Sequence, residues 1–168
     1  MTEGKLMPLM PGDVVQAKVE QVEVFGIFLE YVGQEILVLI PETSWIPCYG
    51  SCRQIAEVGD EFRVRIIARV EHKDQYAGSI RAIYPESDPW SGKWGLRVGD
   101  TAEARVVRMV EHADRCGDKK GYLLELRPAA YVMLFADKDT RLEMGQRCSV
   151  TVTAVNADRR QVVVQLNK

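Results

Sequence analysis

Few side chains in this 168-residue chain could take part in covalent or metal chemistry. Cys48 and Cys52 lie close in sequence, but structural zinc needs a full tetrahedral set of ligands, and neither His72 nor His112 is near them. The chain also lacks a G-x-S-x-G motif, a glycine-rich phosphate loop and a His-x-x-x-His pair. We therefore predict no catalytic residue, no metal site and no cofactor, and a protein that is not an enzyme.

An aromatic pair has the clearest potential for binding. Phe25 and Phe28 surround a glycine and can share one face of a strand, opposite Ile27 and Leu29, which suit a buried core. An exposed pair of this kind can stack on a flat ring. The alternative is that one or both rings pack against another segment of the chain or against a partner protein.

Basic side chains are the second feature that indicates binding. Lys18 points outward from a predicted strand, and a loop at residues 113–120 carries Arg115, Lys119 and Lys120. A basic loop can hold phosphates without selecting a nucleotide sequence. The alternative is an ordinary solvated loop, because two aspartates lie in the same segment.

Three sequence blocks recur in the same order, which indicates an internal repeat. Residues 11–19 align with 98–106, residues 26–40 align without a gap with 121–135, and residues 58–66 align with 144–152. Relative to the first copy, the second gains residues around 113–120 and loses residues opposite 45–53. We predict domains at 10–84 and 96–168, joined by a Pro- and Gly-rich linker at 85–95, whose Trp90 and Trp94 fasten it to a domain face.

Alternating apolar and polar residues predict an all-β fold with five strands in each copy. The expected strands are 14–24, 26–31, 35–40, 61–70 and 76–83, followed by 101–110, 122–127, 131–135, 147–156 and 161–166. Five curved strands in a domain of this size favour a five-stranded Greek-key barrel of the OB type. The sequence therefore predicts two such barrels in tandem.

The alternation also predicts which side chains face each core. In the fourth strand the inward set is Phe62, Val64, Ile66, Ala68 and Val70, and its equivalent in the second copy is Cys148, Val150, Val152 and Ala154. In the first strand the alternation slips after Val19, and it slips at the equivalent place after Val106. A shared slip predicts a β-bulge that bends the strand.

The first copy resembles the S1 RNA-binding domain family, a branch of the OB fold. The resemblance covers roughly residues 10–84, and the second copy resembles the family only through the first. It rests on Gly12-Asp13, Val24-Phe25-Gly26-Ile27-Phe28-Leu29, Ile36-Leu37-Val38-Leu39-Ile40-Pro41-Glu42, Val58-Gly59-Asp60 and Ser79-Ile80-Arg81, in family order and spacing. It implies that Phe25 and Phe28 stack on RNA bases.

The chain also departs from the family pattern. Leu39 stands where family members commonly carry a histidine, Gln75 stands where an arginine is expected, and the acidic position after the fourth strand is Glu71. In the second copy Lys120 and Leu123 replace the two phenylalanines, so a stacking platform is not expected there.

From these features we expect a cytoplasmic protein that binds single-stranded RNA. Phe25 and Phe28 would stack on bases, and Lys18, Arg115, Lys119 and Lys120 would contact phosphates. The expected setting is translation or RNA processing, with the ribosome or RNA-processing proteins as further partners and no membrane association. The alternative is a protein-protein interaction module with a degenerate RNA-binding surface.

The net charge of −2 conceals an uneven distribution. Residues 1–88 hold 8 Lys and Arg against 14 Asp and Glu, a balance of −6, and the remainder holds 14 against 10, a balance of +4. The copy with the aromatic pair is therefore acidic and the other is basic. We expect the two either to divide RNA binding or to present two faces to protein partners.

Overall fold

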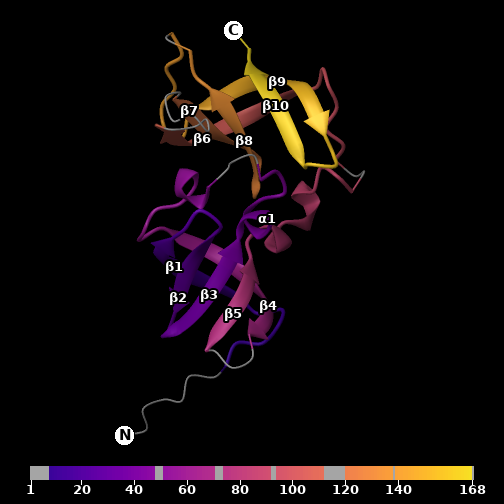
Figure 1. Cartoon of the computed structure of the whole chain (residues 1–168). Helices are drawn as coiled ribbons and strands as arrows, with labels where there is room; N and C mark the ends of the chain where they lie inside the picture. The colour runs from indigo at the N-terminus through magenta and orange to yellow at the C-terminus, as the bar shows by residue number, and fades with distance from the viewer. Residues whose placement is uncertain are drawn as a thin grey trace, which may run out of the picture.

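The computed structural model describes residues 8–47, 51–70, 74–91, 94–111, 120–137 and 139–167. Two five-stranded β-sheet units follow one another along the chain and stack end to end, with the two termini at opposite ends of the molecule (Figure 1). The predicted all-β fold with two tandem barrels is confirmed. Among the residues that the structure describes, none forms a helix that is long and apolar enough to span a bilayer.

The first sheet closes into a barrel with the strand order β1-β2-β3-β5-β4. Its strands are β1 (Val14–Val22), β2 (Gly26–Tyr31), β3 (Gln34–Leu39), β4 (Glu61–Val70) and β5 (Gln75–Ser79). Closure comes from a parallel pairing of β3 with β5. The short helices α1 (Ile40–Thr43) and η1 (Cys52–Gln54) lie in the connection from β3 to β4, and η2 (Arg81–Ile83) and η3 (Pro85–Ser87) follow β5.

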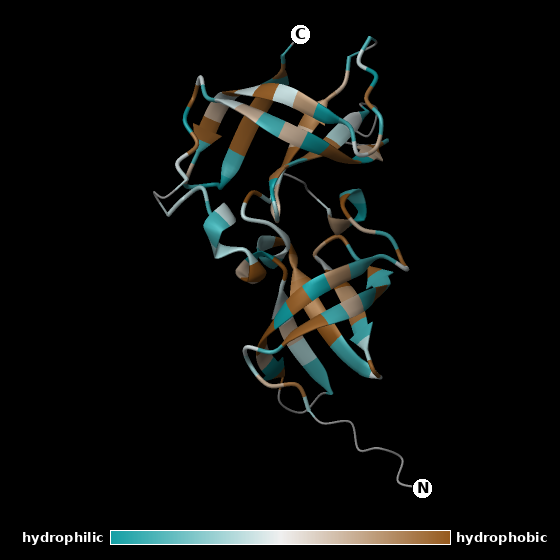
Figure 2. Ribbon diagram, turned by 180° about the vertical axis from the view of Figure 1, so that it is seen from behind, coloured by the Kyte–Doolittle hydropathy of each residue, from teal (hydrophilic) through white to brown (hydrophobic). Residues whose placement is uncertain are grey.

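The second sheet repeats this order as β10-β9-β6-β7-β8. Its strands are β6 (Thr101–Val110), β7 (Gly121–Arg127), β8 (Ala130–Phe135), β9 (Arg147–Asn156) and β10 (Gln161–Leu166). The edge strands of this sheet are β8 and β10, the counterparts of the pair that closes the first barrel. Apolar residues alternate with polar ones along the strands of both barrels (Figure 2), as the periodicity predicts.

The repeated Gly-Asp motif forms the turn before the first strand of each barrel. Gly12 and Gly99 have φ angles of 97° and 95°, which residues with a side chain rarely adopt. The carboxylate of Asp13 accepts a hydrogen bond from the Met10 N–H at 2.8 Å, and the carboxylate of Asp100 accepts one from Arg97 at 2.9 Å. The motif recurs because the turn requires both residues.

The predicted bulge in the first strand of each copy is confirmed. The register of β1 against β2 shifts between Val19 and Gln21, and that of β6 against β7 shifts between Val106 and Arg108, the equivalent place.

A second pair of bulges was missed, and it corrects the inward sets. The register shifts at Ile67 in β4 and at the equivalent Thr153 in β9. Beyond each bulge the faces exchange, so Ala68, Val70 and Ala154 are exposed although the alternation places them inward. Cys148, at the start of β9, is half-buried against the second core.

Two further expectations about strands are wrong in detail. The last strand of the first copy ends at Ser79, and residues 81–83 form η2 instead. The gap-free alignment of Ile36 with Tyr131 is off by one, because Val132 pairs with Leu124 as Ile36 pairs with Leu29. An irregularity near the end of β7 adds the extra residue, and a shift of one residue turns Tyr131 away from the core of its own barrel.

The segment after α1 joins the two barrels. Ile46 is 0% exposed and lies in the apolar core of the second barrel. The Trp45 backbone N–H donates to the Ala129 carbonyl at 2.7 Å, and the Ser44 hydroxyl accepts from the Tyr131 backbone N–H at 3.2 Å. The first barrel thus hydrogen-bonds to residues at and just before the start of edge strand β8, through Trp45, in the stretch that the second copy lacks, and the preceding Ser44.

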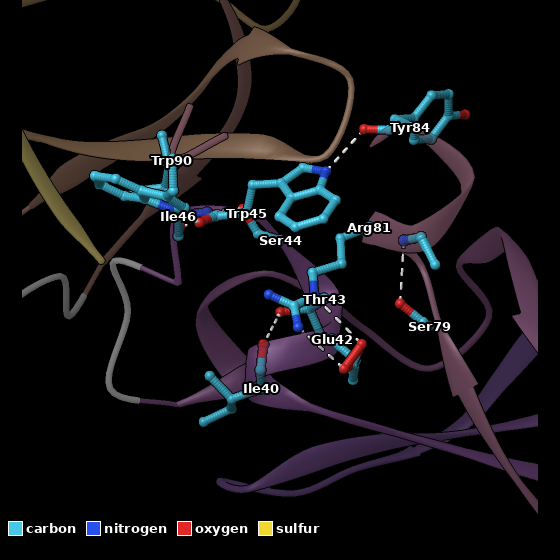
Figure 3. Close-up of polar contacts among 11 residues, drawn as sticks. Ile40, Glu42, Thr43, Ser44, Trp45, Ile46, Ser79, Arg81, Tyr84 and Trp90 are labelled. Carbon is cyan, nitrogen blue, oxygen red and sulfur yellow. Dashed lines mark hydrogen bonds and ion pairs between the residues drawn. The ribbon is translucent and has the colours of Figure 1, made fainter. Parts of the chain in front are cut away.

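Three further contacts hold Trp45 in place (Figure 3). Its indole N–H donates to the Tyr84 carbonyl at 2.8 Å, and its own carbonyl accepts from the Trp90 indole at 2.8 Å. The Arg81 guanidinium lies 4.8 Å from the centre of its ring and pairs with Glu42 at 3.3 Å. Both linker tryptophans pack against the second core, as predicted.

Candidate nucleic-acid interface

The aromatic platform, defined here as Phe25 and Phe28, lies on the outer side of the first barrel. The two ring centres are 6.1 Å apart and the rings are nearly perpendicular. Phe25 is 51% exposed and Phe28 is half-buried, whereas Ile27 and Leu29 between and beyond them are fully buried. Both rings therefore present apolar surface to solvent, as predicted, although Phe25 lies in the turn before β2 and Phe28 lies on the strand.

The turn that carries the platform is fixed by main-chain hydrogen bonds. The Val24 carbonyl accepts from the Cys52 N–H at 3.0 Å, and the Phe25 carbonyl accepts from the Ile40 N–H at 3.1 Å. Cys52 is fully buried, and burial raises the pKa of its thiol to about 12, so the group remains a neutral packing residue at neutral pH. These contacts hold Phe25 in place while about half of the residue stays exposed.

Gly26 is required between the two aromatic residues by close packing. A Cβ atom at this position would lie 2.8 Å from the Val38 carbonyl oxygen and 3.1 Å from a methyl group of Leu37. We predict that Gly26→Ala lowers the free energy of unfolding by about 1–3 kcal/mol in a urea titration, because β3 must move. Gly95→Ala is the matched control, since nothing lies within 4 Å of its added Cβ and the variant should unfold like the wild type. Equal stability of the two variants would contradict this.

The β3 side of the platform is apolar. Leu37 is the cross-strand partner of Phe28, and Leu39 pairs with Gly26 and is 45% exposed. Leu39 stands at the family's histidine position, so no hydrogen-bonding group is present there. Gln75, at the family's arginine position, donates to the Glu35 carboxylate at 2.6 Å.

Lys18 is exposed on the same outer face, as predicted. Its cross-strand partners are Glu30 on β2 and Glu61 on β4. Two acidic neighbours reduce the local positive potential, so any phosphate contact by Lys18 would be weaker than that of an isolated lysine.

A polar cluster that the sequence analysis missed lies on the β1 side. Gln21 is the cross-strand partner of Phe28, and its amide donates to the Glu23 carboxylate at 2.6 Å. The other oxygen of this carboxylate is 3.4 Å from the Arg53 guanidinium. Only part of this cluster could be predicted from the sequence. The bulge after Val19 places Gln21 on the outer face, but Arg53 is 30 residues away from Glu23 in the chain, so their contact could not be expected. We call Gln21, Glu23 and Arg53 the polar cluster.

The corresponding face of the second barrel is covered. Leu123 takes the position of Phe28 there, and Arg108 and Met133 take the positions of its cross-strand partners Gln21 and Leu37. Leu123 is 1% exposed, and with Met133 it packs into the apolar cluster of the first barrel. Arg108 donates to the Asp60 carboxylate at 2.9 Å. The acidic first copy and the basic second copy are therefore joined by an ion pair between Asp60 and Arg108.

Of the other candidate residues, the structure describes Lys120, which is exposed on the second barrel just before β7. Arg115 and Lys119 lie outside the described residues, as do Glu71, Cys48 and both histidines.

A closed five-stranded barrel with this strand order and an outward aromatic pair is an OB-type barrel, a fold that binds oligonucleotides on this side of the sheet. Residues 9–81 match the family model described as the S1 RNA binding domain. The first barrel of this chain therefore matches that family, as the resemblance predicted.

Two curated relatives match nearly the whole chain. The small ribosomal subunit protein bS1 of Streptococcus pneumoniae is 29% identical over 161 residues, which covers 94% of this chain and 39% of that protein. The bS1 homolog of Bacillus cereus is 25% identical over 170 residues and is covered to 42%. The chain thus spans about two fifths of the length of these relatives.

Among solved structures, the chain is similar to the crystal structure of the a/eIF2alpha-aDim2p-rRNA complex from Pyrococcus horikoshii OT3. The two share 23% identity with a TM-score of 0.42, over 47% of this chain and 48% of that one.

Proposed function

We propose that the chain binds single-stranded RNA through the aromatic platform of its first barrel. The observation that carries the proposal is the nearly perpendicular pair of the exposed Phe25, in the turn before β2, and the half-buried Phe28, on β2 of an S1-family barrel. Aromatic rings of this kind stack on unpaired bases, each worth about 1–3 kcal/mol. Bases in a duplex are already stacked on each other and cannot reach the rings.

The second barrel contributes charge rather than stacking. Its platform position is occupied by the buried Leu123, so the RNA would lie on the first barrel. The basic loop with Arg115, Lys119 and Lys120 would contact phosphates, and Lys18 would add a weaker contact beside Glu30. Binding should therefore weaken with rising salt.

The proposed setting is translation. It is supported by the similarity over nearly the whole chain to proteins named small ribosomal subunit protein bS1. We propose the ribosome or RNA-processing proteins as the surroundings in which the RNA is met. A cytoplasmic location and a purely binding, non-catalytic role belong to the same proposal.

The proposal is tested by comparing one labelled RNA as a single strand and as a duplex. Fluorescence anisotropy at low salt should give at least about tenfold tighter binding of the single strand, because only its bases can stack. Raising the salt should weaken both complexes. Equal affinity for the two forms would reject stacking and leave only phosphate attraction.

A second candidate is a protein-interaction module, and one observation favours it. Val24, Phe25 and Leu39 are each about half exposed, which gives the first barrel an apolar patch where the family commonly has a histidine. In the second barrel the same face packs against the first barrel of this chain, through Leu123 and Met133. Capture of one protein partner that survives nuclease treatment and is lost in Leu39→Asp would support this candidate.

A further inference from the structure

We propose that Gln21 hydrogen-bonds to the edge of the base that stacks on Phe28 and thereby favours adenine over uracil. The inference rests on the proposed function and deepens it, because it assigns base preference to one residue. It depends on the polar cluster, which lies on one side of the platform, while Leu37 and Leu39 on the other side offer no hydrogen bond.

The orientation of the Gln21 amide is fixed by its partner. An ionised carboxylate only accepts hydrogen bonds, so the NH2 group of Gln21 faces Glu23, at 2.6 Å, and the amide oxygen faces away. Glu23 is held in turn by Arg53 at 3.4 Å and by its own N–H, which donates to the Gly26 carbonyl at 2.9 Å. The amide therefore presents an acceptor and one remaining N–H donor in a defined order.

The position of Gln21 is suited to contact whatever occupies the platform. It is exposed on the outer face as the direct cross-strand partner of Phe28. The second barrel holds Arg108 at the same ladder position, beside Leu123. There the face is covered by the first barrel, and Arg108 reaches a polar group of that covering segment, the Asp60 carboxylate, at 2.9 Å. The same position in the first barrel would reach a polar group of a stacked base.

The chemistry of the amide selects among bases. Adenine presents an amino group beside a ring nitrogen acceptor, and a glutamine amide can bond to both at once. Uracil carries a carbonyl oxygen where adenine has the amino group, so an amide held in one orientation meets an acceptor with its own oxygen. A good bidentate pair discriminates between bases by about fivefold or more.

The test compares oligoadenylate and oligouridylate of equal length on the full chain. Wild type should bind oligoadenylate more tightly, and Gln21→Ala should weaken oligoadenylate by about tenfold with little effect on oligouridylate. Glu23→Gln should also lower the ratio, because an amide partner can donate as well as accept and no longer fixes Gln21. Gln16→Ala is the matched control, since it is an exposed glutamine on the same strand that pairs with Arg63, away from the platform.

The outcomes separate this inference from the proposed function. An equal loss for both oligomers in Gln21→Ala, or no loss, would overturn the role of Gln21 while single-strand binding stands. A change in the ratio in Gln16→Ala as large as in Gln21→Ala would also overturn it. Failure of wild type to bind either oligomer would reject the proposed function itself.

Discussion

Replacing Phe28 by alanine should weaken binding of single-stranded RNA by tenfold or more at constant salt. The ring is half-buried on the outer face and takes part in the platform with Phe25 at 6.1 Å, so the substitution removes the surface on which a base would stack. Loss of one stacked base costs about 1–3 kcal/mol. The dissociation constant is measured by fluorescence anisotropy, and circular dichroism checks that the barrel remains folded.

Two variants make the result specific. Phe28→Leu keeps apolar packing but removes the aromatic face, so it should lose nearly as much affinity as Phe28→Ala. Phe135→Ala removes a half-exposed phenylalanine on β8 of the second barrel and should change affinity less than about twofold. Full RNA affinity in a folded Phe28→Leu chain would contradict the stacking role.

Replacing Ile46 by alanine should destabilise the second barrel, although the residue belongs to a connection of the first. Ile46 is 0% exposed in the second core, beside the hydrogen bonds of Ser44 and Trp45 to the start of β8. A large-to-small substitution at a fully buried site costs about 2–5 kcal/mol. The free energy of unfolding from urea titration measures the loss, and hydrogen exchange should locate it in β8 and β10.

Ile67→Ala is the matched control for this experiment. Ile67 is 45% exposed at the β4 bulge, so its truncation should change the free energy of unfolding by less than about 0.5 kcal/mol. If Ile46→Ala were equally mild, or if exchange increased only in the first barrel, the second barrel would not depend on this segment.

The strands and the platform were predictable because their causes are local. Alternation fixes which residues of β2 face the core and leaves Phe28 outside, whereas Phe25 is exposed because it lies in the turn before the strand. The bulge near Val19 was predictable because the alternation visibly slips there and again near Val106. The bulges at Ile67 and Thr153 were missed because small or apolar residues on both sides leave no visible slip.

The contacts between the barrels were not predictable, because they join residues far apart in the chain. The extra stretch at 45–53 was identified as a loop of the first copy, but nothing in its composition shows that Ile46 enters the other core. The same holds for Arg53, which reaches the platform only through Glu23. The domain division at 84 and 96 stays a prediction. Ile46, a residue of the first copy, lies in the core of the second.

Titration of the isotopically labelled chain with short single-stranded RNA tests binding at the platform most directly. At low salt the amide signals of β2 and of the Val24–Phe25 turn should shift, together with Gln21 and Leu37. The signals of Leu123 and Met133 should stay in place, because that face is covered by the first barrel. Absence of any shift at low salt and near-millimolar RNA, or shifts confined to the second barrel, would contradict it.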